Sequence, residues 1–92
     1  MEFDFKGQTA VVTGGTRGIG RAVSEAFLKA GAKVIATYRS NEEEAKKFTE
    51  ANVAYAECLD IYKFDVTSYD EVENFYKEVE NKHGALQIVV VS

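Results

Sequence analysis

The feature that most constrains this chain is a glycine-rich turn between a predicted strand and a predicted helix. Residues 8–13 form a largely apolar strand-like segment, and they run directly into Thr13-Gly14-Gly15-Thr16-Arg17-Gly18-Ile19-Gly20. Residues 18–30 then carry apolar side chains at helical spacing. Glycines let the backbone approach a ligand closely, and the N–H groups at a helix start attract anions. The pattern therefore predicts a cradle for a phosphate or pyrophosphate group.

The rest of the chain continues the alternation of strand and helix. We expect further strands at 33–37, 59–64 and 86–91, and helices that run from a Ser40 cap to residue 51 and from a Ser68 cap to residue 83. Residues 52–58 fit either an extra helical turn or a loop. The predicted order β-α-β-α-β-α-β indicates one α/β domain over residues 1–92 with a parallel sheet, and right-handed crossovers constrain its topology. If the first three strands run in the order 3-2-1, the fourth lies on the far side of the first, and we expect the strand order 3-2-1-4. The first two helices would share one face of a three-layer, Rossmann-like half-domain, and the third would cover the other.

Helical spacing also predicts which side chains are buried. In the first helix the apolar stripe comprises Ile19, Ala22, Val23, Ala26, Phe27 and Ala30. In the second helix it comprises Ala45, Phe48 and either Ala51 or Asn52. In the third it comprises Val72, Phe75, Tyr76 and Val79.

Composition excludes several classes of function. The chain has 92 residues, 46% of them hydrophobic, and a net charge of −4 without a basic stripe, which disfavours both disorder and a nucleic-acid partner. A single cysteine and a single histidine leave no internal disulfide and no His/Cys metal site. His83 falls in the last turn of a predicted helix, where a cation meets the helix dipole. No apolar run approaches the length of about 20 residues that spans a membrane, so we expect a cytoplasmic protein.

Two motifs together identify a family resemblance. Thr13-Gly14-x-x-x-Gly18-x-Gly20 follows the first predicted strand, and Asp65-Val66 follows the third. With these flanks the chain resembles, over nearly its whole length, the N-terminal cofactor-binding half of the classical short-chain dehydrogenase/reductases, and most of all the 3-oxoacyl-acyl-carrier-protein reductases. The resemblance implies a dinucleotide cofactor, and for the family an NADPH-dependent reduction of a 3-oxoacyl thioester or a similar carbonyl.

The resemblance also implies residue roles. Thr16 and Ile19 would present backbone N–H groups to the phosphates, the Asp65 carboxylate would accept from the adenine amino group, and the Val66 N–H would donate to an adenine ring nitrogen. The candidate cofactor-binding residues are Thr13, Gly14, Thr16, Arg17, Gly18, Ile19, Gly20, Arg39, Ser40, Asp65 and Val66.

The end of the second predicted strand indicates which cofactor is preferred. NAD sites usually carry Asp or Glu there, which binds the ribose 2′-hydroxyl and repels a 2′-phosphate. This chain has Thr37-Tyr38-Arg39-Ser40 and no acid. Arg39, Ser40 at a helix start, and Arg17 in the glycine turn suit a 2′-phosphate, so NADP(H) is favoured over NAD(H).

The family's reducing machinery has no counterpart in these residues. None of the five tyrosines is followed by Lys four positions later, and Val91-Ser92 stands where the family has Asn-Asn-Ala-Gly. Without the tyrosine acid a carbonyl oxygen has no proton donor. We therefore assign no catalytic residue and expect no reductase activity from this chain alone. Two alternatives stay open, namely a self-associating structural or designed module and a flavodoxin-like mononucleotide binder.

The predicted sheet also suggests self-association. One helix, 68–83, would cover a whole face of four strands, and the apolar strand 86–91 would form an unpaired edge. Open apolar faces and edges favour association, and a two-fold dimer is the simplest closed arrangement. We expect a homodimer through the open sheet face or the edge of the fourth strand.

Overall fold

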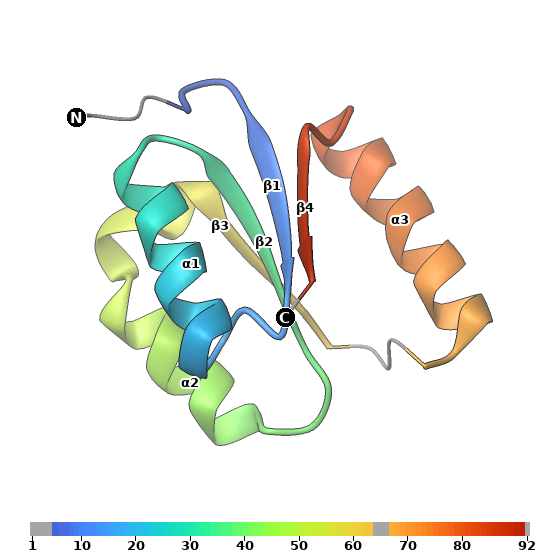
Figure 1. Cartoon of the computed structure of the whole chain (residues 1–92), viewed down its shortest axis with the longest axis horizontal. Helices are drawn as coiled ribbons and strands as arrows, with labels where there is room; N and C mark the ends of the chain where they lie inside the picture. The colour runs from blue at the N-terminus through green and yellow to red at the C-terminus, as the bar shows by residue number, and fades with distance from the viewer. Residues whose placement is uncertain (1–4, 64–66, 92) are drawn as a thin grey trace.

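The computed structural model describes residues 5–63 and 67–91, which fold into a parallel sheet with helices on both faces (Figure 1). Its elements are β1 (Thr9–Thr13), α1 (Gly18–Lys29), β2 (Lys33–Tyr38), α2 (Glu42–Ala51), the 3-10 helix η1 (Val53–Cys58), β3 (Leu59–Lys63), α3 (Tyr69–His83) and β4 (Ile88–Val91). The strand order is β3-β2-β1-β4 with every pairing parallel, which confirms the predicted topology. Residues 52–58, which the sequence pattern left as either an extra helical turn or a loop, are largely the 3-10 helix η1.

The central strands are buried on both sides because helices cover both faces of the sheet. In Figure 1, α1 and α2 lie on one side and α3 on the other, as predicted. Val11 and Ile35 are register partners and pack against α3, whereas Val12 and Ala36, the next pair, pack on the side of α1 and α2. This alternation follows from the two-residue period of a strand.

The predicted apolar stripe of α3 is confirmed. Phe75 and Val79 are buried against Val11 and Ile35, with Val72 and Tyr76 partly buried beside them. The Phe75 ring makes edge contacts with Tyr62 and Tyr76, at centroid distances of 5.4 and 5.2 Å. Ser68 caps the helix as expected, because its side chain accepts from the Glu71 N–H. Gly84 ends it with a positive φ of 79°.

The stripe predicted for α1 is wrong for several of its members. Ile19 is 80% exposed, Ala22 and Ala26 are also exposed, and the buried positions are Gly20, Ser24 and Leu28. Val23 and Phe27 are only partly buried. The first two inner positions of α1 are therefore held by small residues, Gly20 and Ser24. Apolar periodicity alone could not fix this rotation.

The start of α2 differs from the prediction by one residue. Asn41, rather than Ser40, is the N-cap, and its side-chain oxygen accepts from the Glu44 N–H at 3.1 Å. Asn and Ser cap helices about equally well, so the sequence pattern does not separate them. Ala45 and Phe48 are buried as expected, and Asn52, not Ala51, is the third buried position.

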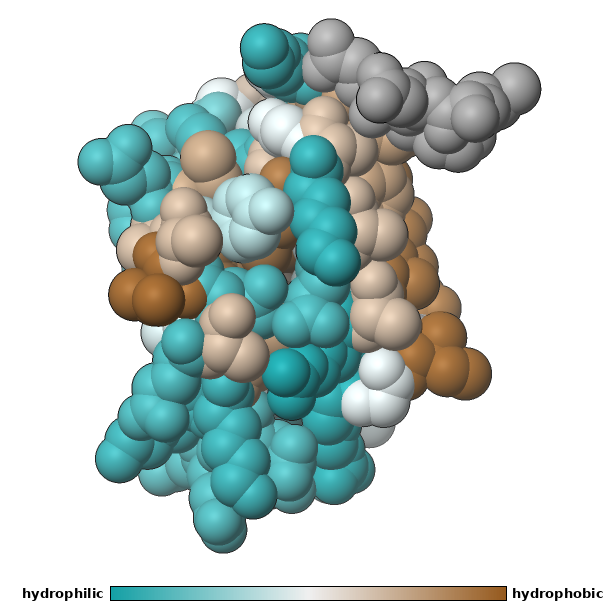
Figure 2. Space-filling model, turned by 90° about the vertical axis from the view of Figure 1, so that its left-hand side faces the viewer, coloured by the Kyte–Doolittle hydropathy of each residue, from teal (hydrophilic) through white to brown (hydrophobic). Residues whose placement is uncertain are grey.

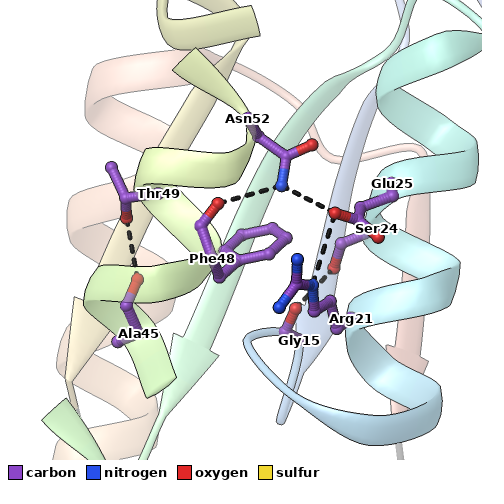
Figure 3. Close-up of polar contacts among 8 residues, drawn as sticks. All are labelled: Gly15, Arg21, Ser24, Glu25, Ala45, Phe48, Thr49 and Asn52. Atoms are coloured by element: carbon purple, nitrogen blue, oxygen red, sulfur yellow. Dashed lines mark hydrogen bonds and ion pairs between the residues drawn. The ribbon is translucent and has the colours of Figure 1, made fainter. Parts of the chain in front are cut away.

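A network of hydrogen bonds connects α1 to the end of α2 (Figure 3). The Asn52 amide donates to the Phe48 carbonyl at 2.9 Å and to the Glu25 carboxylate at 2.8 Å, and Arg21 donates to the same carboxylate oxygen at 3.3 Å. The hydrogen bond from Asn52 is the main reason why the pKa of Glu25 is lowered. Asn52 is 6% exposed, so it belongs to the packing between the two helices.

The sheet face under α3 is more completely covered than predicted. Val11 and Ile35 are fully buried there, so one helix shields the two central strands. On that face Val89 and Val91 of β4 are 49% and 79% exposed. The opposite side, with α1 and α2, is hydrophilic over its lower half, and strongly hydrophobic groups appear along the right-hand border and at the left edge of that view (Figure 2). Within residues 5–63 and 67–91, no helix is long and apolar enough to cross a bilayer.

Candidate functional site

The glycine turn connects the carboxyl end of β1 to the start of α1. Gly14 and Gly18 have positive φ values of 66° and 58°, a region that side chains disfavour. Gly15 donates its N–H to the Thr37 carbonyl of β2 at 3.1 Å, so the turn is held against the neighbouring strand. The turn therefore lies over the carboxyl ends of two adjacent strands, the place where open α/β sheets bind ligands.

The start of α1 is suited to bind an anion. Its N-cap, Arg17, has an extended conformation and makes no side-chain cap, and the first turn carries no acidic residue. By contrast, Asn41 and Ser68 cap α2 and α3, whose first turns are acidic. The first N–H groups of any helix lack partners within it and carry a partial positive charge. At α1, neither a capping side chain nor a carboxylate offsets that charge.

A pocket of about 300 Å³ lies between the glycine turn and the end of β2. Among the residues described, it is lined by Gly14, Thr16, Arg17, Tyr38, Arg39, Ser40 and Asn41. Two arginines reach it from different strand–helix connections, and none of these lining residues is acidic. Tyr38 and Asn41 were not predicted as site residues, although both flank the Arg39-Ser40 pair that was.

The other predicted site residues are not among those that line this pocket, and two of them lie outside the described residues. Thr13 is 8% exposed, and its hydroxyl donates to the Val90 carbonyl at 3.3 Å, which ties β1 to β4. Gly18, Ile19 and Gly20 form the first residues of α1, where Gly18 and Ile19 are exposed and Gly20 is buried. Asp65 and Val66 lie outside the described residues.

Negative charges next to the pocket are paired with lysines. The first turn of α2 carries Glu42, Glu43 and Glu44. Lys63, at the end of β3, donates to the Glu42 carboxylate, and this hydrogen bond lowers the pKa of Glu42. Lys47 lies within 4 Å of both Glu43 and Glu44. These pairs are largely exposed and weak, but they reduce the negative field near the two arginines.

A second polar cluster lies between β3 and the end of α3. One oxygen of Asp60 is 2.9 Å from Lys82 Nζ and 2.9 Å from His83 Nε2. The sequence relates His83 only to the helix dipole, because nothing in it pairs this histidine with a residue 23 positions earlier. Burial raises the pKa of Asp60, but the hydrogen bonds from Lys82 and His83 outweigh it, so the pKa is lowered. The part of the chain that the structure describes shows no group of side chains suited to hold a metal.

The Asp60 cluster leads to a prediction about acid stability. A carboxyl whose pKa is lowered on folding stabilises the fold above its unfolded pKa, near 3.9, and loses that contribution as the pH falls through its folded value. We expect Asp60→Asn to lower the free energy of unfolding by about 1 kcal/mol at pH 7 and by much less at pH 3. Urea denaturation at both pH values measures this. Glu73→Gln, which breaks only the exposed Glu73–Lys77 pair of α3, is the control. An equal loss at both pH values would contradict the prediction.

Comparison with known proteins shows which family and which relatives the chain is similar to. Residues 8–92 match a family model described as short chain dehydrogenase. The chain is 38% identical to "3beta-hydroxysteroid dehydrogenase 2" of Eggerthella lenta over 91% of its own length and 32% of that protein's. It is 39% identical to "Acetoacetyl-CoA reductase" of Paracoccus denitrificans over 90% of its length and 32% of that protein's.

A solved structure supports the same grouping. The "Pseudomonas aeruginosa RhlG/NADP active-site complex" superimposes with a TM-score of 0.84 at 28% identity, covering 98% of this chain and 36% of that one. The chain therefore spans about a third of the length of these relatives, and the portion it shares with them contains the glycine turn and the pocket.

Proposed function

The chain belongs to the short-chain dehydrogenase family, and on that basis we propose that it binds a dinucleotide cofactor, with NADP(H) preferred over NAD(H). The observation that carries the proposal is the pocket at the glycine turn. There the uncapped start of α1 and two arginines, Arg17 and Arg39, lie together without an acidic lining residue among those described.

The residues present fit such a cofactor. The pyrophosphate would lie at the glycine turn and the α1 N-terminus, which supply backbone N–H groups and a favourable dipole. The adenosine end, with its 2′-phosphate, would lie between Arg17 and Arg39 with Ser40 beside them. Guanidinium groups bind phosphate through two parallel hydrogen bonds, and this geometry favours NADP(H). Asp65 and Val66 remain the proposed adenine contacts.

The reaction is proposed only for a longer protein that would contain this portion. A bound nicotinamide supplies or accepts a hydride, and the relatives whose names specify an activity include a reductase of acetoacetyl-CoA. We propose reduction of a 3-oxoacyl thioester or a similar carbonyl as that activity. The residues of this chain hold and orient the cofactor, and its 92 residues contain no Tyr-x-x-x-Lys pair to protonate a carbonyl.

Calorimetric titration with NADP⁺, NAD⁺ and FMN tests the binding proposal. We expect NADP⁺ to bind more tightly than NAD⁺ by about tenfold or more, which corresponds to about 1.4 kcal/mol. The titration with FMN tests the alternative of a mononucleotide binder, and we expect FMN to give no binding heat. No heat with either dinucleotide, in a sample that is folded by circular dichroism, would contradict the proposal and favour the purely structural alternative.

We further propose that the 92-residue chain forms a homodimer through the edge of β4. Within the described residues β4 pairs only with β1, so its other edge is unpaired, and Val89 and Val91 are exposed beside it. A two-fold axis perpendicular to the sheet would pair the edge with its own copy in antiparallel fashion.

Sedimentation equilibrium tests the dimer. We expect Val89→Lys combined with Val91→Lys to convert it to a monomer, because two buried cations at the interface would lack partners. Val53→Lys is the matched control, since Val53 is equally apolar and 73% exposed but lies on η1. A wild-type chain that stays monomeric at high concentration would contradict the proposal.

A further inference from the structure

A serine inside α1 forms a hydrogen bond with the glycine turn. Ser24 is fully buried, and its hydroxyl donates to the Gly15 carbonyl oxygen at 3.0 Å (Figure 3). This bond joins residues nine positions apart and runs from the helix back to the turn that precedes it. It differs from the hydroxyl–carbonyl bond of Thr49, which stays within α2 and reaches Ala45 at 2.9 Å.

The backbone N–H of Gly15 forms a second hydrogen bond, to the sheet. Its N–H donates to the Thr37 carbonyl of β2 at 3.1 Å. A Cβ on Gly15 would lie 2.7 Å from the Ser24 hydroxyl oxygen and 2.8 Å from the Val12 carbonyl oxygen. The missing side chain of Gly15 is thus what gives the Ser24 hydroxyl its space. The two residues form a matched pair that fixes the turn between α1 and β2.

The direction of the Gly15 carbonyl fixes the direction of the next N–H. No peptide bond among the described residues is cis, and in a trans peptide the C=O and the following N–H point in opposite directions. Since the Gly15 carbonyl points to Ser24, the Thr16 N–H points the other way, away from the Ser24 hydroxyl. Thr16 and its neighbour Arg17 both line the pocket.

From this geometry we propose that Ser24 is a positioning residue for phosphate binding, and the proposal rests on the dinucleotide binding argued above. By holding the Gly15–Thr16 peptide in one orientation, the hydroxyl keeps the Thr16 N–H aimed at the diphosphate. A flexible peptide would spend part of its time turned away from the ligand, and the affinity would fall by that fraction. Ser24 would act on every ligand that places a diphosphate in the cradle, whatever its ribose carries.

The test compares Ser24→Ala with Thr49→Ala, which removes a similar bond far from the turn. Dissociation constants are measured by calorimetry for NADP⁺, NAD⁺ and inorganic pyrophosphate, at a temperature where circular dichroism shows each variant to be folded. We expect Ser24→Ala to weaken all three ligands by about fivefold, as loss of one modest hydrogen bond predicts. Thr49→Ala should leave all three within about twofold of wild type on the same scale.

A spectroscopic readout separates positioning from a general loss of stability. In ¹⁵N-resolved spectra of the ligand-free chain, Ser24→Ala should shift the Thr16 amide resonance and speed its hydrogen exchange, while the amides of α2 stay unchanged. If wild type binds NADP⁺ but Ser24→Ala binds all three ligands equally well, the positioning role is overturned and the proposed function stands. If wild type binds none of the three, the proposed function itself fails, and the positioning role with it.

Discussion

Replacing Arg39 with alanine is expected to weaken NADP⁺ binding by about 1.5–3 kcal/mol more than NAD⁺ binding. Arg39 lines the pocket together with Arg17 and Ser40, and its guanidinium suits the 2′-phosphate that only NADP⁺ carries. Loss of a charge-assisted contact to that phosphate therefore affects one cofactor and spares the other. On the affinity scale this is roughly a 10- to 150-fold change in the ratio of the two dissociation constants.

Arg21→Ala is the matched control for this variant. Arg21 also belongs to the segment after the glycine turn, but its side chain is engaged by Glu25, and Arg21 is not among the residues that line the pocket. We expect it to leave the ratio of NADP⁺ to NAD⁺ affinity unchanged. Calorimetry on both variants measures the two ratios. Equal losses for NADP⁺ and NAD⁺ on removal of Arg39 would refute its assignment to the 2′-phosphate.

Gly15→Ala should lower the free energy of unfolding by about 2 kcal/mol, the usual range for overpacking a tight site. The added methyl would meet the Ser24 hydroxyl oxygen at 2.7 Å, the Val12 carbonyl oxygen at 2.8 Å and the Ala36 methyl at 3.0 Å. Ser24→Ala removes the first of these contacts. We therefore expect Gly15→Ala to cost about half as much in the Ser24→Ala background, a coupling of about 1 kcal/mol.

Urea denaturation of the four proteins in this double-mutant cycle measures the coupling. Gly18→Ala is the control glycine, because its φ of 58° strains any side chain but nothing lies within 4 Å of its added Cβ. Its cost should be the same in the wild-type and Ser24→Ala backgrounds, since no clash with the hydroxyl is involved. Costs of Gly15→Ala and Ser24→Ala that simply add would show that the two residues do not share space as described.

The topology and the pocket were predictable because they follow from short-range patterns. Strand–turn–helix units and right-handed crossovers restrict the sheet to a few strand orders, of which the expected 3-2-1-4 is the one observed, and parallel strands bring their carboxyl ends to one edge. Arg17 and Arg39 follow the carboxyl ends of β1 and β2, two neighbouring strands, so their convergence could be expected.

The features that the sequence did not predict depend on packing between distant residues. The rotation of α1 buries Gly20 and Ser24 and exposes Ile19 and Ala22, which the apolar periodicity had placed on the inner face. The Asp60–His83 contact likewise joins a strand to a helix end with no local signal. The Ser24–Gly15 pair was missed because both residues fit their local patterns as an ordinary helix residue and an ordinary turn glycine.

The sharpest test of cofactor binding at this pocket is a titration of the ¹⁵N-labelled chain with adenosine 2′,5′-bisphosphate and with 5′-AMP. These ligands differ only in the 2′-phosphate, and neither needs a nicotinamide site. We predict that the bisphosphate binds about tenfold or more tightly, with amide shifts concentrated at residues 14–17 and 38–41, which contain the lining residues of the pocket. Equal affinities, or shifts that avoid the glycine turn and the end of β2, would contradict the assignment of this pocket to NADP(H).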